Sequence, residues 1–434
     1  MAYHLDEEAL ELLIRDSASS CGYPLLKDQQ KQVVLSFCQG KDIFACLPTG
    51  FGKSACFVIL PKLFDLLRKE SPGHSIVIVI SPLNSLMKDQ VRSCRERGVA
   101  AAAVTHDDKS SEEEAIKGGF QIVYISPEMI LGTKKWRSVL DSNLYQSRLV
   151  GLVIDEAHCV KTWGDDFRQM FKELGHLRAL IPTGTNMMAL TATATTRSRL
   201  EICLRLGMEN PHVVQLSPDK PNIFLSCNEF DSIPASFGLL AKRLKEERTK
   251  MGRVIIFCKK IALCSQIYSY FLYILREGFT EPRGVSVASI ESRLVDMFTS
   301  GTHPEVKEVI LKSFQSQTAP LRIVIATIAF GMGIDCPDVR EIIHVGPPSD
   351  VEDYVQQIGR AGRDNLPSFA TVLYGRNLMR NTSKTMLEYC RRNDLCRRNF
   401  LFSEFDSYSP SYNRGCHCCD VCSIICSCFN CSFN

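Results

Sequence analysis

The stretch DIFACLPTGFGKSACF, residues 42–57, decides the fold of this chain. It predicts an apolar strand (42–47), a glycine-bearing loop and the start of a helix. Gly50 and Gly52 allow the backbone to curl so that its N–H groups point at phosphates, and the helix N-terminus adds its dipole. In such a loop Lys53 reaches the β- and γ-phosphates, and the Ser54 hydroxyl ligates Mg²⁺.

The loop departs from the strict phosphate-loop pattern, which has glycine where this chain has Leu47. A GKS tripeptide also arises by chance in a long chain, so the tripeptide alone is weak support. The strand before it and the helix after it are what favour a nucleotide site.

Short apolar runs alternate with helix-length amphipathic stretches along most of the chain. These runs predict strands at 42–47, 75–81, 121–126, 149–155 and 186–192, and after a gap at 253–258, 322–327, 341–346 and 370–375. Continuous apolar strands separated by helices indicate buried parallel sheets. The two sets predict two α/β units, joined near LSPDKPNIF (216–224), where two prolines lie among turn-forming residues.

The composition is that of a globular protein. Of the 434 residues, 45% are hydrophobic and 23% charged, and the net charge of +3 gives no strong indication of a polyanionic partner. The N-terminus is acidic and amphipathic, unlike a secretory signal, and the apolar runs are too short to span a membrane. Most of the 20 cysteines stand singly in apolar segments, which favours core thiols in a reducing compartment. We therefore expect an intracellular protein without a membrane span.

The run RLVGLVIDEAH (148–158) ends an apolar strand with two carboxylates. Ligand sites in open α/β sheets lie at the carboxyl ends of the strands, so both acids are expected near the phosphate loop. Asp155 is then placed to hold Mg²⁺, and Glu156 to orient and activate an attacking water. The alternative, a solvated turn, is disfavoured by the phosphate loop upstream.

The segment YVQQIGRAGRD (354–364) places Arg360 and Arg363 three residues apart, on one face of an expected helix. An ATPase needs cations opposite the γ-phosphate to stabilise charge in the transition state. Taken alone, the two arginines would be read as part of a surface helix. With the loop and the acids, they predict catalytic arginines on the second unit and ATP in a cleft between the units.

In this order the motifs resemble those of superfamily 2 helicases, and more narrowly the RecQ family of DNA helicases. The resemblance covers about residues 20–425 and runs through PLLKDQQKQVV (24–34), LPTGFGKS (47–54), SPLNSLMKDQV (81–91), ISPE (125–128), DEAH (155–158), CVKTWGDDFRQMF (159–171), TATAT (191–195), IATIAFGMGID (325–335) and QQIGRAGRD (356–364). It implies two RecA-like parallel-sheet lobes in tandem plus a small helical zinc-binding subdomain. It also implies an enzyme that uses ATP and Mg²⁺ to move 3′ to 5′ on single-stranded DNA and to unwind duplexes.

The resemblance implies further nucleotide-binding residues. Gln30 is the expected adenine reader, and Lys27 stands where arginine is usual. Asp335 closes the IATIAFGMGID motif of the second unit. The nucleotide loop comprises Thr49, Gly50, Phe51, Gly52, Lys53 and Ser54, with Phe51 in place of the more usual glycine.

The loop after the acidic pair is a candidate contact for single-stranded nucleic acid. Trp163 and Phe167 lie four residues apart beside Arg168, a combination that suits base stacking and phosphate contact. The resemblance makes His158 a relay between this loop and the ATP site, and adds Ser81 through the SPLNSLMKDQV motif. The alternative is that Trp163 and Phe167 are ordinary core aromatics.

The cysteine-rich end GCHCCDVCSIICSCFNC (415–431) offers the spacing of a zinc site. The arrangement resembles the RecQ zinc subdomain, with one cysteine on a helix and three clustered later. The ligands expected on this basis are Cys396, Cys416, Cys419 and Cys422. The remaining cysteines of the region are then spare: Cys390, Cys418, Cys426, Cys428 and Cys431. His417 as a ligand and a disulfide pairing stay open as alternatives.

Two departures from the family pattern affect the expected activity. The segment SIESRLVDMFTSGTHPEVKEVILKSF (289–314) replaces a short helicase segment, and we interpret it as a surface-loop variation plus a helix. No winged-helix module follows the zinc site, so strand separation is expected to be weak or to need a partner protein. Basic residues before the zinc site either bind DNA phosphates or form a solvated helix face: Arg376, Arg380, Lys384, Arg391, Arg392, Arg397 and Arg398.

We expect four segments: a first lobe at 1–216, a second lobe at 217–378, a zinc-binding subdomain at 379–425 and an unassigned tail at 426–434. The expected function is a DNA helicase in repair, recombination or replication, located in the nucleus and acting on single-stranded and tailed duplex DNA. Two alternatives remain open, an RNA helicase or nucleic-acid-stimulated ATPase with the same motor, and a non-motor scaffold with a degenerate ATP cleft.

Overall fold

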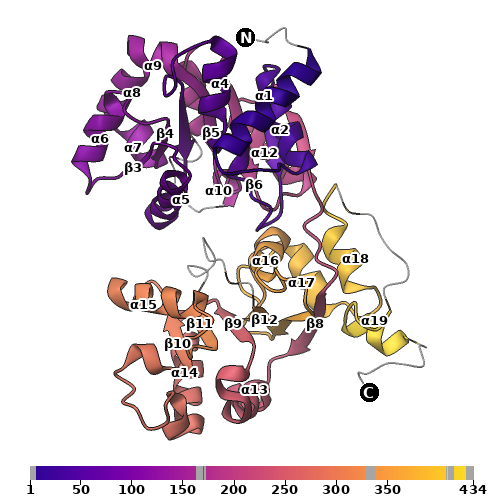
Figure 1. The fold of residues 1–434 in the computed structure, drawn as a ribbon. Helices are drawn as coiled ribbons and strands as arrows, with labels where there is room; N and C mark the ends of the chain where they lie inside the picture. Colours follow the sequence, from indigo (N-terminus) through magenta and orange to yellow (C-terminus); the bar gives the residue numbers. More distant parts are fainter. Residues whose placement is uncertain are drawn as a thin grey trace. The chain divides into compact units, whose positions relative to one another are not determined.

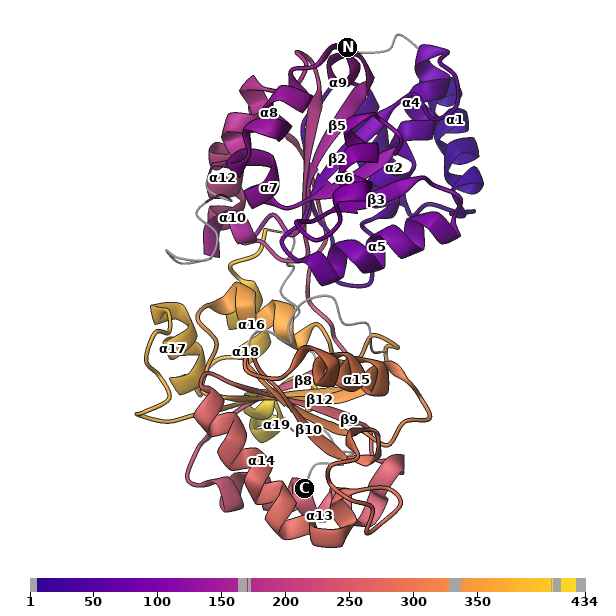
Figure 2. The same cartoon turned by 90° about the vertical axis from the view of Figure 1, so that its left-hand side faces the viewer.

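The computed structural model describes residues 6–162, 170, 173–327, 336, 338–406, 408 and 415–426. The chain forms two compact units, Met1–Ser217 (unit 1) and Pro218–Asn434 (unit 2), which Figure 1 and Figure 2 show from two sides. Each unit is a parallel β-sheet flanked by helices, which confirms the predicted α/β class with two tandem RecA-like lobes. The expectations for Trp163, Phe167, Arg168 and Asp335 concern residues outside the described ranges.

Unit 1 is built on a seven-stranded parallel sheet with the order β3-β4-β2-β5-β6-β1-β7. Its strands are β1 (Ile43–Cys46), β2 (Ile76–Ile80), β3 (Ala101–Val104), β4 (Ile122–Ile125), β5 (Leu149–Ile154), β6 (Asn186–Thr191) and β7 (His212–Gln215). In β2, Val77 and Val79 join one apolar cluster, whereas Ile76, Ile78 and Ile80 join another. Because successive side chains of a strand point to opposite faces, a sheet covered on both faces requires a continuous apolar run.

The helices of unit 1 begin where side chains can satisfy the first free N–H groups. The Asp6 carboxylate accepts from the Ala9 N–H at 2.7 Å to start α1, and the Thr195 hydroxyl accepts from the Ser198 N–H at 3.2 Å to start α12. The described helices are α1 (Glu7–Ser20), α2 (Asp28–Cys38), α3 (Ala55–Val58), α4 (Leu60–Arg68), α5 (Asn84–Glu96), α6 (Lys109–Ile116), α7 (Pro127–Gly132), α8 (Lys134–Leu140), α9 (Asn143–Arg148), α10 (Cys159–Thr162), the 3₁₀ helix η1 (Leu174–Ala179) and α12 (Thr196–Arg205).

Unit 2 carries a six-stranded parallel sheet with the order β10-β11-β9-β12-β13-β8. Its strands are β8 (Ile223–Glu229), β9 (Arg253–Cys258), β10 (Val295–Phe298), β11 (Ile323–Ala326), β12 (Val339–Val345) and β13 (Ser368–Tyr374). The central strand β9 again divides its side chains, with Ile255 and Phe257 in one buried cluster and Val254 and Ile256 in the other. The described helices are α13 (Ile233–Glu247), η2 (Arg248–Lys250), α14 (Ile261–Leu275), η3 (Arg276–Phe279), η4 (Ile290–Ser292), α15 (Pro304–Gln315), α16 (Val351–Ile358), α17 (Lys384–Arg391), α18 (Arg397–Phe402) and α19 (Asp420–Ile425).

The C-terminal helices pack on the β8 side of the unit 2 sheet (Figure 1). Met386, Tyr389 and Leu401 are buried in the same cluster as the residues of β8 and β13. The main chain of β8 also meets the cysteine segment directly, because the Leu225 N–H donates to the Cys418 carbonyl oxygen at 3.3 Å. The segment after 378 therefore shares a core with the second sheet, and its separation as a subdomain remains a prediction.

Within the described ranges, four strands were not predicted: β3, β7, β8 and β10. Strand β3 consists mostly of alanine, which has a low strand propensity. Strand β8 lies at the edge of its sheet, and its buried and half-buried residues alternate, so it shows no continuous apolar run. The interpretation of 289–314 as surface loop plus helix was wrong in part, because the segment contributes the edge strand β10. Burial of Val295 and Phe298 explains this placement.

None of the described helices combines the length and the apolar character that a membrane-spanning helix needs.

Candidate nucleotide site and cysteine cluster

The loop between β1 and α3 has the backbone of a phosphate cradle. Gly50 has φ +82° and Gly52 has φ +87°, the left-handed region that side chains other than glycine rarely adopt. The Lys53 ammonium donates to the Leu47 carbonyl oxygen at 3.2 Å, so it folds back over the loop. Thr49 and Ser54 are half-buried in the same loop. These residues fit a nucleotide phosphate and a Mg²⁺ ion at the start of the helix.

Lys27 and Gln30 hold this loop from the start of α2. The Gln30 amide nitrogen donates to the carbonyl oxygens of Phe51 at 3.1 Å and Gly52 at 2.9 Å, while its oxygen accepts from the Lys27 N–H at 2.8 Å. The Lys27 ammonium donates to the Phe51 carbonyl oxygen at 3.2 Å and lies 4.1 Å from the centre of the Phe51 ring. Gln30, the adenine reader that the resemblance implies, and Lys27 therefore both support the loop, and Phe51 supplies a cation–π partner.

Asp155 and Glu156 follow β5 at the carboxyl end of the sheet. Asp155 is buried, and its carboxylate accepts from the Gln90 side chain of α5 at 2.9 Å. Burial and the neighbouring Glu156 raise the pKa of Asp155 to about 6, whereas the nearby Lys53 ammonium lowers it. The structure thus brings Lys53 and Asp155 together, as the sequence predicts, and a divalent cation would stabilise the charged carboxylate.

His158 is buried and contacts the acidic pair. Its Nδ1 lies 3.2 Å from the Glu156 carboxylate and 3.2 Å from the Thr191 hydroxyl, which belongs to the TATAT motif. Burial alone would lower the pKa of His158, but Cys159 and Glu156 raise it well above its ordinary value. These contacts suit a relay between motifs and do not suit direct contact with DNA.

Ser81 directly follows strand β2 of unit 1. The residue is wholly buried at the end of β2, and its N–H donates to the Ile125 carbonyl oxygen at 3.1 Å. Strand β2 is flanked by β4 and β5 in the middle of the sheet, which explains the burial. The Ser81 side chain is thus buried beside the sheet, and its contact with nucleic acid stays a prediction.

In unit 2, the two predicted catalytic arginines lie in a turn and not on a helix face. Helix α16 ends at Ile358, and the chain then turns through Gly359 and Gly362, of which Gly362 has φ +58°. Arg360 is buried with 6% exposure, and Arg363 is half-buried. The expected helical spacing of Arg360 and Arg363 was wrong, because the glycines allow the chain to leave the helix before both of them.

Four cysteines form a cluster near the C-terminus. Among the described residues, the sulfur atoms of Cys396, Cys418, Cys419 and Cys422 all lie within 4.8 Å of one another. The Cys396 and Cys418 sulfurs are 3.5 Å apart, close to the spacing of about 3.8 Å that Zn–S bonds of about 2.3 Å give in a tetrahedron. Hydrogen bonds from Cys418 and Cys419 lower the pKa of the Cys396 thiol, so the site favours a thiolate. The donor set fits zinc.

The fourth member of the cluster differs from the expectation. The spacing predicts Cys416 as the fourth ligand and Cys418 as spare, but Cys418 lies in the cluster in place of Cys416. The cause is the hydrogen bond from β8 to the Cys418 carbonyl together with the bridge between Leu225 and Cys419, which fix this segment along the strand. Cys416 is buried elsewhere in the segment.

Comparison with known proteins agrees with this geometry. A family model of DEAD/DEAH box helicases matches residues 27–202, and one of the helicase conserved C-terminal domain matches residues 236–365. The ATP-dependent DNA helicase RecQ of Pasteurella multocida is 32% identical over 359 residues, which cover 81% of this chain and 50% of the relative. The ATP-dependent helicase wrn-1 of Caenorhabditis elegans is 31% identical over 432 residues, 93% of this chain and 38% of the relative.

The chain belongs to the RecQ family of helicases.

Solved structures of other helicases share the fold of this RecQ chain. Dbp5 of S. cerevisiae, bound to RNA and ADP BeF3, matches with a TM-score of 0.63 and 15% identity over 94% of this chain and 95% of Dbp5. The helicase MrfA bound to DNA matches with a TM-score of 0.65 and 17% identity over 93% of this chain and 54% of MrfA. At these identities the likeness concerns the fold alone. The chain also spans about half or less of the two curated relatives named above.

Several residues of the RecQ site were not singled out from the sequence. Gln90 lies within the SPLNSLMKDQV motif, but only the fold brings it to Asp155. Lys220 and Asn222 lie in the stretch 216–224, where the sequence predicts the join of the two units, yet both side chains contact the arginine turn. A lysine and an asparagine between prolines and strand residues give no signal of their own, since their partners lie about 140 positions later in the sequence.

Proposed function

We propose that this chain is the motor of an ATP-dependent DNA helicase that moves 3′ to 5′ on single-stranded DNA and unwinds duplexes, in repair, recombination or replication. The observation that carries the proposal is the meeting of the Lys53 loop with the buried Asp155 carboxylate at the carboxyl end of one parallel sheet. A cation beside a carboxylate at this position suits phosphates and Mg²⁺. The relatives named RecQ and wrn-1 support DNA as the substrate.

The residues divide the work of hydrolysis. Lys53 binds the phosphates, Ser54 and Asp155 hold Mg²⁺, and Glu156 orients the attacking water. The cations of the GRAGR turn neutralise charge that develops on the phosphoryl group. Arg363 is the more accessible of its two arginines and is the better candidate for this role, while Asp335 remains a proposed nucleotide contact.

Two further parts of the proposal concern nucleic acid and zinc. Trp163, Phe167 and Arg168 would stack on bases and contact phosphates of single-stranded DNA. His158 would transmit that contact to Glu156, because it lies 3.2 Å from this carboxylate. Zinc held by the four clustered cysteines would fasten the C-terminal helices to β8. We also propose that the protein acts in the nucleus, which imaging of the tagged chain in cells would test.

The test is an unwinding and ATPase assay on duplexes with a 3′ tail, a 5′ tail or blunt ends, with Lys53→Ala as the inactive control. We expect hydrolysis stimulated by single-stranded DNA and strand separation only from the 3′ tail. Unwinding from the 5′ tail would refute the polarity. Stronger stimulation by RNA than by DNA would favour the RNA helicase. Equally slow hydrolysis by the wild type and Lys53→Ala in excess DNA would favour the non-motor scaffold.

A further inference from the structure

The turn that carries Arg360 and Arg363 is held by two side chains from the first residues of unit 2. The Lys220 ammonium donates to the carbonyl oxygens of Gly359 at 2.6 Å and Ala361 at 3.1 Å. These two carbonyls flank Arg360 on either side. The position of the Arg360 backbone therefore depends on the Lys220 ammonium.

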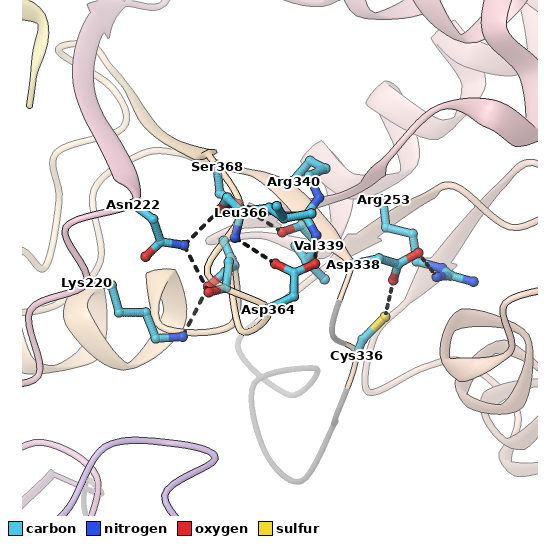
Figure 3. Close-up of polar contacts among 12 residues, drawn as sticks. Lys220, Asn222, Arg253, Cys336, Asp338, Val339, Arg340, Asp364, Leu366 and Ser368 are labelled. Atoms are coloured by element: carbon cyan, nitrogen blue, oxygen red, sulfur yellow. Dashed lines mark hydrogen bonds and ion pairs between the residues drawn. The ribbon is translucent and has the colours of Figure 1, made fainter. Parts of the chain in front are cut away.

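Asn222 holds the other half of the turn. Its amide nitrogen donates to the carbonyl oxygens of Gly362 at 3.0 Å and Leu366 at 2.9 Å, and Figure 3 shows both side chains directed toward the turn. A Cβ placed on Gly362 would lie only 2.2 Å from this nitrogen. The glycine and Asn222 thus fit one another, and Gly362 precedes Arg363.

The far side of the turn is fixed by β12. The Gly362 N–H donates to the Val339 carbonyl oxygen at 3.1 Å, and Arg340 forms an ion pair with Asp364. Arg340 also donates to the Ser368 hydroxyl at 3.2 Å, at the start of β13 (Figure 3). The turn is therefore clamped between the sheet on one side and the Lys220–Asn222 pair on the other.

The position of the Lys220 ammonium beside Arg360 and Arg363 is electrostatically unfavourable. Burial, Arg363 and Arg360 lower the pKa of Lys220 to about 8, and only Asp364 acts against them. The hydrogen bonds of Lys220 to the Gly359 and Ala361 carbonyls offset the cost of lying beside two arginines. The arrangement gathers three cations at one turn, which an anionic phosphoryl group would stabilise.

The segment that bears Lys220 is anchored in turn by Arg398. This wholly buried guanidinium pairs with Asp219 and donates to the carbonyl oxygens of Lys220, at 3.0 Å, and of Ile223. Arg398 follows Cys396 of the cysteine cluster by two residues. Lys220 is thus fixed at its backbone by unit 2's C-terminal helices and at its ammonium by the arginine turn.

We propose that Lys220 and Asn222 are positioning residues that hold Arg360 and Arg363 in the geometry needed for ATP hydrolysis. The inference rests on the proposed function, since it gives the arginines a catalytic role. It assigns a task to the first residues of unit 2, to which the motifs alone give no role.

The experiment compares Lys220→Met with Lys312→Met, a control that removes an exposed lysine of the same unit, paired with Glu308. Lys220→Met is expected to lower kcat for DNA-stimulated ATP hydrolysis by about tenfold or more, because small displacements of catalytic groups are costly. KM for ATP is expected to change less than about twofold, because the phosphate loop is untouched. Values of kcat within about twofold of the wild type would overturn the inference.

A combined variant tests whether Lys220 affects kcat by positioning the arginines or by a separate route. If Lys220 acts through the two arginines, adding Lys220→Met to an Arg360→Ala/Arg363→Ala variant lowers kcat no further. An additive loss would overturn the proposal. Asn222→Ala is the second test variant if Lys220→Met does not fold.

Hydrogen exchange gives a readout that needs no ATPase activity. The amides of Arg360, Ala361 and Gly362 donate to carbonyls within or beside the turn, so Lys220→Met should speed exchange in a peptide spanning 359–366. Exchange in a peptide over β11 should stay unchanged. Unaltered exchange in the turn overturns the inference, whereas a wild-type chain without DNA-stimulated hydrolysis refutes the proposed function separately.

Discussion

Gln30 holds Gly52: its amide nitrogen donates a 2.9 Å hydrogen bond to the Gly52 carbonyl oxygen. A Cβ on Gly52 would lie 3.0 Å from that same nitrogen, and the glycine has φ +87°. The residue expected to read adenine is thus also a support of the loop expected to bind phosphates. A base-reading role and a loop-supporting role make different predictions about nucleotide choice.

We predict that Gln30→Glu weakens the binding of ATP and GTP alike, so that KM rises about tenfold for both nucleotides. The carboxylate cannot donate to the Phe51 and Gly52 carbonyls, so the loop loses its support whatever the base. Gln32→Glu, two positions along the same helix and exposed, is the control. Steady-state ATPase and GTPase assays make the measurement. A loss confined to ATP would assign Gln30 to adenine alone.

Cys418→Ser is predicted to lose most of the bound zinc, whereas Cys416→Ser keeps it. Only Cys418 lies with Cys396, Cys419 and Cys422 in the described cluster, and three thiolates bind zinc more weakly than four. Elemental analysis of the two purified variants after dialysis gives the comparison. Full zinc in Cys418→Ser together with loss in Cys416→Ser would restore the ligand set expected from spacing.

Breaking the buried ion pair of Arg398 and Asp219 is predicted to lower the free energy of unfolding far more than breaking a surface pair. Their side chains are 1% and 6% exposed, so Arg398→Met leaves a buried carboxylate without this guanidinium and costs about 3–5 kcal/mol. Arg392→Met removes a partly exposed arginine paired with Glu388, and should cost about 1 kcal/mol or less. Denaturant unfolding of unit 2 measures both. Similar costs for the two variants would contradict the prediction.

His344 is predicted to make unit 2 sensitive to acid. It is fully buried, stacks 5.2 Å from Phe257, and shares a 2.8 Å hydrogen bond with the Gln357 side-chain oxygen, so it is neutral with the proton on Nε2. Burial lowers the pKa of His344 to about 4, only partly opposed by Gln357. Unfolding releases the imidazole to a pKa of about 6.5.

Because the folded pKa lies below the unfolded one, the contribution of His344 is fully present above pH 6.5 and is lost as the pH falls toward 4. At pH 5 the loss amounts to about 2 kcal/mol. His344→Asn keeps a donor for Gln357, and should show that much less change in the free energy of unfolding between pH 7 and pH 5. His303→Asn, at an exposed histidine of the same unit, should leave the wild-type pH dependence unaltered. Identical profiles for His344→Asn and the wild type would contradict the assignment.

Local sequence patterns were enough to predict the inner strands of the two sheets and the phosphate loop. The run IVIVI (76–80) is apolar at every position because both faces of the sheet are covered, and that requirement shows in the sequence. The glycines of the phosphate loop can also be recognised from the sequence, since the positive φ angles at these positions require glycine. The sequence did not predict the edge strands, because a strand that is covered on one face needs no continuous apolar run, as β8 shows.

The sequence by itself determined which chemistry this RecQ chain carries: a lysine loop, a carboxylate pair, an arginine turn and a set of thiols. Only the tertiary structure decided which side chains complete each site. Gln90 reaches Asp155 from α5, Cys418 replaces Cys416 because β8 fixes its segment, and Lys220 reaches Ala361 across 141 positions. Spacing reports neighbours along a strand or helix, whereas these contacts arise from how separate elements pack against one sheet.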